Sequence, residues 1–179
     1  MLYIVLALVL LLLIAVAFLR LVRTHDTRVT DLNDLTGRTR TVDMEAFQNL
    51  IDPAETLFLK QQLQPALFRL VQRERILAST EYVRNIAHNA GLLIQLGQLA
   101  RNNADPQVAD AAHAMVERAL RIRLMSMLVL VKLYSHSLIP ALPFDADGIY
   151  RDYRNLTESA ILFTRLQRPA FAGRVSALL

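Results

Sequence analysis

The sequence predicts an all-helical protein: a single N-terminal transmembrane helix, then a polar linker, then an antiparallel helical bundle of about three long helices plus short N-terminal helices. Three observations support this. Residues 2–19 contain no charged side chain. Proline divides the remaining chain into segments of helical length. No segment shows the alternation of apolar and polar residues that marks a strand.

Residues 1–23 are predicted to be a membrane anchor with a basic flank. Eighteen helical residues span about 27 Å, so residues 1–22 can cross a hydrocarbon core of about 30 Å. A helix satisfies its own backbone hydrogen bonds in lipid, as an open strand cannot. A buried core helix and a cleaved signal peptide are the alternatives. The small residues Ala15 and Ala17 fit a cleavage site, but no basic residue precedes the apolar run, so we expect the anchor to be retained.

The orientation of this anchor follows from its flanks. Arg20, Arg23 and Arg28 lie on the C-terminal side, and only the amino terminus lies on the other. Basic residues accumulate on the cytoplasmic side of single membrane helices. We therefore expect the helical domain to be cytoplasmic.

Residues 24–41 are polar and are predicted to form a juxtamembrane linker, and proline marks the helices that follow it. Asp52 before Pro53 supplies a capping side chain and a proline suited to the first helical position, and Asp105 before Pro106 repeats this start. Pro65 ends one short helix and begins a long one. The expected helices are 42–51, 53–63, 65–103, 106–138 and 147–168, which together form a bundle domain at 42–168 before a C-terminal tail at 169–179.

Composition excludes several functions. The formal charge is +4, and Arg20 and Arg23 contribute two of these charges, so residues 24–179 carry only +2. The acidic residues are interleaved with the basic ones, unlike the basic faces of nucleic-acid-binding proteins, so we expect no nucleic-acid partner. The chain has no cysteine, which excludes thiolate catalysis and cysteine zinc sites. The sequence identifies no cofactor and no small-molecule ligand.

The helix expected at 65–103 contains the motif Ala87-His88-Asn89-Ala90-Gly91, followed by Gly97. It resembles the histidine phosphotransfer domain, a helical bundle whose phosphorylated histidine is followed by glycines that clear space for a response regulator. The resemblance implies that His88 is a phosphoacceptor. The motif lacks the lysine after the histidine, and Gly91 is one position too near. Helical spacing places His88 on a polar face with Glu81 and Arg84, where an exposed histidine is most often only solvated.

His113 belongs to a different pattern. It begins an apolar stripe at 3–4 spacing, which predicts a buried, hydrogen-bonded core histidine. Haem or chlorophyll ligation is the alternative. The stripe comprises His113, Val116, Leu120, Leu124, Met127, Val131, Tyr134 and Leu138. His25 and His136 are not at ligand spacing, so no metal site is predicted.

Two small basic clusters lie on the long helices: Arg69, Arg73 and Arg75, and then Arg118, Arg121 and Arg123. Glu74 and Glu117 are beside them, and Glu117 and Arg121 have the i, i+4 spacing of a helical ion pair. We expect solvated, ion-paired faces. Phosphate or lipid binding is the alternative.

The segment 122–134 is apolar in nearly every direction around a helix, although it is too short to span a bilayer. Ile122, Met125 and Val129 lie opposite the His113 stripe, so simple three-helix packing leaves them exposed. They are the candidate partner interface. The sequence therefore predicts a non-enzymatic interaction protein that binds a protein in or at the membrane, and the alternative is a membrane-tethered phosphotransfer module using His88.

Overall fold

The computed structural model describes residues 35, 37–138 and 147–167, and within them it contains five helices and no strand. These are α3 (Met44–Ile51), α4 (Pro53–Gln62), α5 (Pro65–Ala100), α6 (Pro106–Leu138) and α7 (Asp147–Gln167). The all-helical class is confirmed, and the expected helix boundaries agree with the observed ones to within a few residues. The predicted anchor at 1–23 and the tail at 169–179 lie outside the described residues.

Aspartate and proline start the helices as their sequence positions predict. Asp52 Oδ1 accepts a hydrogen bond from the Ala54 amide at 2.8 Å, and Pro53 begins α4. Asp105 Oδ1 accepts from the Gln107 amide at 2.9 Å, and Pro106 begins α6. Each carboxylate satisfies an amide that has no partner inside its helix.

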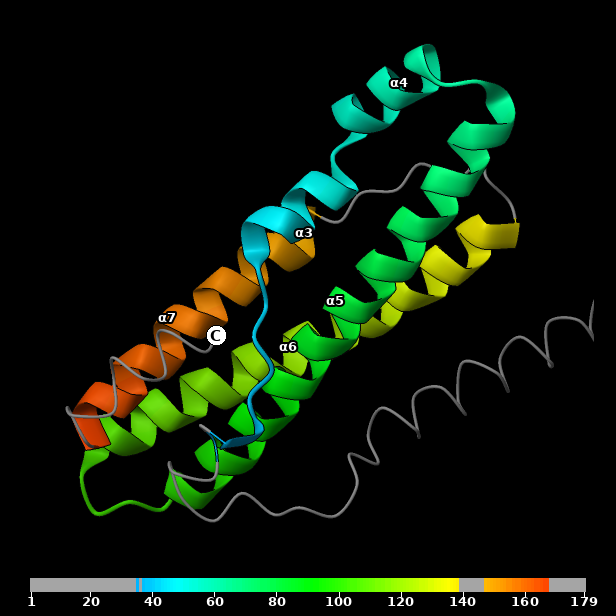
Figure 1. Ribbon diagram of the computed structural model, residues 1–179. Helices are drawn as coiled ribbons and strands as arrows, with labels where there is room; N and C mark the ends of the chain where they lie inside the picture. The colour runs from blue at the N-terminus through cyan, green and yellow to red at the C-terminus, as the bar shows by residue number, and fades with distance from the viewer. Residues whose placement is uncertain (1–34, 36, 139–146, 168–179) are drawn as a thin grey trace, which may run out of the picture.

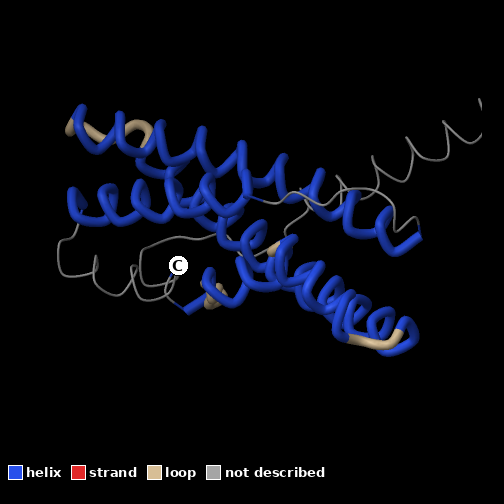
Figure 2. Tube along the Cα trace, turned by 90° about the horizontal axis from the view of Figure 1, so that it is seen from above, coloured by secondary structure: helices blue, strands red, loops and turns tan. Residues whose placement is uncertain are grey.

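Helix α6 runs antiparallel to both α5 and α7, which therefore run in the same direction (Figure 1). Short loops join consecutive helices from α3 to α6, and Figure 2 shows these loops as brief tan segments between the helices. Helix α6 packs extensively against both α5 and α7, whereas α5 and α7 touch each other little. Helix α3 lies over α5 and α7. The core therefore forms where α6 meets its two neighbours, with α3 covering part of it.

No helix within the described part of the chain is both long enough and apolar enough to cross a membrane.

The close approach of α5 and α6 depends on Gly97. A Cβ atom at this position would lie 2.5 Å from Cγ2 of Val116 and 3.2 Å from the carbonyl oxygen of Ala112. Both distances are shorter than ordinary van der Waals contact, and the backbone oxygen cannot move independently of α6. Gly97 therefore sets the spacing between the two longest helices.

We predict that Gly97→Ala destabilises the domain by about 1–3 kcal/mol, because α6 must shift to accept the methyl group. Chemical denaturation of the full chain measures this. Gly37→Ala is the matched control, since a Cβ atom there meets nothing within 4 Å. Equal stability of the two variants would show that α5 and α6 are not packed as closely as described.

Candidate functional site

A strap formed by residues 38–43 lies along α5 before α3 begins: Arg38 ends a helical turn, and residues 39–43 have no regular secondary structure (Figure 1). Asn89 of α5 holds it. The side-chain oxygen of Asn89 accepts from the Arg40 amide at 2.9 Å, and its nitrogen donates to the Arg40 carbonyl at 2.7 Å. The Asn89 side chain thus satisfies both backbone groups of Arg40, as a neighbouring strand would.

Asn89 also reaches α7. Its side-chain nitrogen donates to the Tyr153 hydroxyl at 2.8 Å, and both residues are buried in the core. Burial raises the pKa of Tyr153 to about 12, although the hydrogen bond from Asn89 opposes this shift. The phenol is therefore neutral at physiological pH, and its role is to complete a polar network that joins the strap, α5 and α7.

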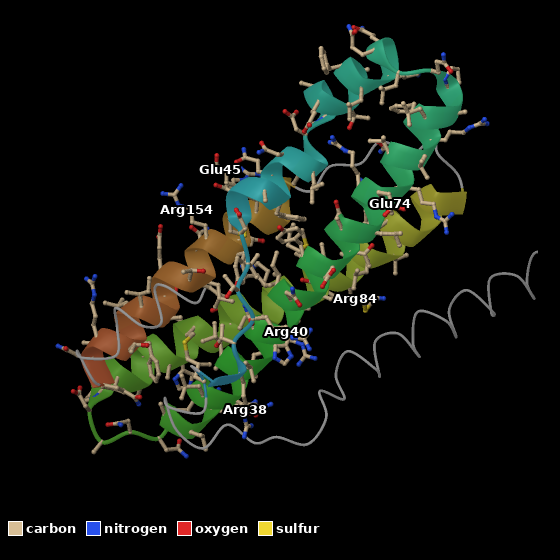
Figure 3. All side chains as sticks on the ribbon, in the orientation of Figure 1. Arg38, Arg40, Glu45, Glu74, Arg84 and Arg154 are labelled. Carbon is tan, nitrogen blue, oxygen red and sulfur yellow. The ribbon has the colours of Figure 1, made fainter. Side chains whose placement is uncertain are left out.

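His88 lies half-buried against the strap, so the prediction that it faces water on a charged surface is only partly right. Its Nε2 is 3.1 Å from the Arg38 carbonyl oxygen, which a neutral imidazole contacts by donating its Nε2 proton. Figure 3 shows Arg38 and Arg40 on the strap and Arg84 on α5. This contact leaves only Nδ1 of His88 for any phosphoryl group, and the phosphoacceptor role stays a prediction.

The glycines that carry the phosphotransfer resemblance do not clear an open surface. Gly91 and Gly97 are both buried within the domain. Gly97 faces α6, where it permits close helix packing. The space that these glycines create is thus filled by the bundle itself.

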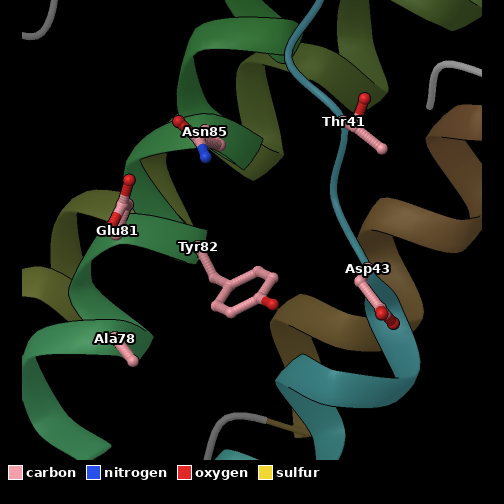
Figure 4. Close-up of a pocket in the computed structure, with 6 residues that line it drawn as sticks. All are labelled: Thr41, Asp43, Ala78, Glu81, Tyr82 and Asn85. Atoms are coloured by element: carbon pink, nitrogen blue, oxygen red, sulfur yellow. The ribbon is translucent and has the colours of Figure 1, made fainter. Parts of the chain in front are cut away.

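An open pocket of about 330 Å³ lies between the strap and α5. Figure 4 shows Tyr82 pointing from α5 toward the strap, and the full lining is Thr41, Asp43, Ala78, Glu81, Tyr82 and Asn85. Asp43 already accepts a hydrogen bond from the Ala46 amide at the start of α3. No group of three potential metal ligands occurs in the described residues. The pocket offers hydrogen-bonding groups and two carboxylates, which suit recognition of a polar group better than catalysis.

The prediction of a core histidine at position 113 is wrong. His113 is exposed, and its Nδ1 lies 2.9 Å from the Ala109 carbonyl oxygen of its own helix. The physical reason is that most of the stripe which His113 begins faces outward from α6, although Val116 packs against α5. Its leucines Leu120 and Leu124 are exposed rather than buried.

The prediction that Ile122, Met125 and Val129 are exposed is also wrong. Ile122 and Val129 are only 0% and 7% exposed, and Met125 is half-buried. These residues turn inward because α6 lies between two helices and packs against both of them. The outward face instead carries Leu120, Leu124 and Leu128, which are 54%, 52% and 52% exposed.

The two basic clusters do not form the simple ion-paired faces that were expected. Arg75 is buried and donates to the carbonyl oxygens of Asn49 and Leu50 at 3.1 and 3.0 Å, which ties the end of α3 to α5. It also contacts Glu55 at 3.3 Å. In the second cluster, Arg118 donates to the Asn155 carbonyl and the Ser159 hydroxyl of α7.

Arg123, also in the second cluster, is half-buried, and burial lowers its pKa. No ion pair joins Glu117 to Arg121 within the part of the chain that the structure describes. Two members of the first cluster, Arg69 and Arg73, remain exposed.

We predict that Asn89→Ala destabilises the domain by roughly 2–4 kcal/mol, because it leaves several buried polar groups without partners. Tyr153→Phe should cost only about 0.5–1.5 kcal/mol, since Asn89 keeps both hydrogen bonds to Arg40. Hydrogen exchange at the Arg40 amide should accelerate in Asn89→Ala. Unchanged exchange there would mean that Asn89 does not hold the strap.

We also predict that the domain loses stability in mild acid through His88. Burial lowers the pKa of His88 below 6.5, the hydrogen bond with the Arg38 carbonyl raises it, and the charge of Arg40 lowers it. As the pH falls, His88 is therefore protonated in the unfolded chain at a higher pH than in the folded chain. The stabilisation is therefore complete above a pH of about 6.5 and is lost as the pH falls through the folded-state pKa.

Urea unfolding of the full chain at pH of about 7.5 and about 5.5 measures this loss. His88→Gln is the control, because its amide can still donate to the Arg38 carbonyl but does not titrate. The variant should lose less stability than the natural chain between the two pH values. Equal losses would assign the acid sensitivity to other groups.

No protein family model, curated protein or solved structure is significantly similar to this chain. Function must therefore be inferred from the described residues. The hydrogen bonds of Asn89 join three parts of the fold: the strap, α5 and α7. The outward face of α6, in contrast, presents a row of leucines that no described element covers.

Proposed function

We propose that this chain is a membrane-anchored, non-enzymatic helical interaction protein, an accessory or stabilising subunit of a larger membrane protein complex. Residues 1–22 span the bilayer, and the helical domain lies on the cytoplasmic side. The domain binds a protein partner in or at the membrane through the outward face of α6. This face is defined here as Leu120, Leu124 and Leu128.

The observation that carries the proposal is that α6 is apolar on opposite sides. Its inner side fills the core with Met115, Ile122 and Val129. A helix that only covers a core needs one apolar stripe. The three leucines on the outer side recur at every fourth residue, so they form one continuous row about 12 Å long, the geometry that receives a partner helix.

The charges beside the α6 face favour a protein partner over a lipid surface. Glu117 and Arg121 flank the leucine row, and both are exposed. They carry opposite charges, and the other two arginines of this cluster do not add a free charge to the row: Arg118 binds α7, and Arg123 is half-buried. A surface with balanced charge gains nothing from an anionic bilayer, whereas it can pair with both signs of charge on a protein.

The membrane anchor compensates for the small size of this face. Three half-exposed leucines bury less surface than a stable interface between two freely diffusing proteins needs. Confinement in the same bilayer raises the effective concentration of two partners, so a modest contact is sufficient. The non-enzymatic assignment rests on the polar network, because Asn89, His88 and Tyr153 are all engaged in holding the strap.

We predict that Leu124→Glu removes the partner without unfolding the domain, because an exposed side chain contributes little to stability. Native co-purification of the full chain in mild detergent measures partner retention. Leu99→Glu, at an exposed leucine on α5, is the matched control and should keep the partner. The proposal fails if both variants retain the same associated protein, or if Leu124→Glu lowers the melting temperature substantially.

A further inference from the structure

The hairpin formed by α4 and the first turns of α5, residues 53–73, projects from the bundle (Figure 1). Helix α4 contributes no buried residue. Leu57 and Phe58 of α4 are each 59% exposed, and Leu67 and Leu70 in the first turns of α5 are exposed as well. A soluble domain rarely leaves so many large apolar side chains uncovered in one small element.

Helix α4 also lacks the packing that normally holds a short helix. It has ten residues, and its main neighbour is α5. A helix of this length is marginal in water unless tertiary contacts stabilise it. The cap from Asp52 and the ion pair of Glu55 with Arg75 fix its first turn but cover none of its leucines. The large apolar side chains of the hairpin are therefore left uncovered by the described residues.

The charges of the hairpin indicate the kind of surface that can cover these side chains. Lys60, Arg69 and Arg73 are exposed, and none has an ion-pair partner in the described residues. Of the nearby acids, Glu55 contacts Arg75, and Glu74 is exposed. The hairpin is thus both apolar and positively charged, unlike the electrically balanced α6 face. Leucine and phenylalanine beside lysine and arginine are the combination that binds the interface of an anionic bilayer.

We propose that the α4–α5 hairpin rests on the surface of an anionic lipid bilayer. Its leucines and Phe58 enter the interface, and Lys60, Arg69 and Arg73 contact the headgroups. This inference rests on the proposed membrane attachment of the chain. Residues 24–34 can extend for roughly 36–40 Å, so a domain anchored by residues 1–22 stays within reach of the same membrane surface.

The natural chain contains no tryptophan, so a single substitution gives a clean fluorescent reporter. Phe58→Trp places the reporter in the hairpin. Leu162→Trp, at a leucine of α7 that is 57% exposed, is the matched control. Both full-length variants are reconstituted in vesicles of phosphatidylcholine and phosphatidylglycerol with brominated acyl chains, which quench tryptophan only on contact. We expect Phe58→Trp to lose most of its emission and Leu162→Trp to keep it.

Charge removal tests the lipid assignment further. Replacing Lys60, Arg69 and Arg73 with Gln in the Phe58→Trp chain should weaken the contact by about fivefold per cation, equivalent to about 1 kcal/mol each. Quenching should then decrease, and it should also decrease in vesicles of phosphatidylcholine alone. A blue-shifted but unquenched reporter would overturn the proposal, because a protein surface, not lipid, would then cover the hairpin.

Flotation of the vesicles separates this inference from the membrane anchor. A chain that floats with an unquenched Phe58→Trp reporter keeps its anchor and refutes the hairpin contact. A chain that is quenched on anionic vesicles but released by high salt supports the hairpin and refutes the anchor. A chain that does not float with either vesicle refutes both.

Discussion

The placement of the strap and of α3 on the bundle depends on one buried side chain, Asn89. Its amide satisfies both backbone groups of Arg40 and the hydroxyl of Tyr153, so it joins the strap, α5 and α7 at a single point. The strap places α3, and Arg75 then fixes the end of α3 by binding its last carbonyl groups. A fully buried amide is costly unless every partner is present, so the strap is held in one position only.

The position of α6 between α5 and α7 explains why its sequence is apolar in most directions. Two helices cover its inner sides, and the leucine row remains on the outside. The hairpin exposes leucines as well, but beside cations that form no ion pair with any described residue. Apolar exposure alone therefore does not distinguish the two proposed partners, and the proposals rest on the accompanying charge: balanced charge beside Leu124 suits protein, and positive charge beside Phe58 suits anionic lipid.

Helix class and boundaries could be predicted because their signals are local. An aspartate before a proline caps a helix whatever lies around it, as Asp52 and Asp105 do. The inward side of α6 could not be predicted, because both of its stripes have helical spacing and only the neighbouring helices decide between them. The Asn89 network was missed for the same reason: its partner Arg40 is 49 residues away, and the sequence gives no signal that a helical asparagine is buried.

The strap and the hairpin lie at separate points along α5, and this separation bears on the proposed function. His88 and Asn89 meet the strap about twenty residues after Arg69, which corresponds to about 30 Å of helix. In the proposed arrangement, the anchor alone attaches the domain to the membrane at a single point. Under the proposed arrangement, a second contact at the hairpin fixes the direction of α5 and hence of α6. A fixed leucine row loses less orientational freedom on binding, so a small interface can hold its partner.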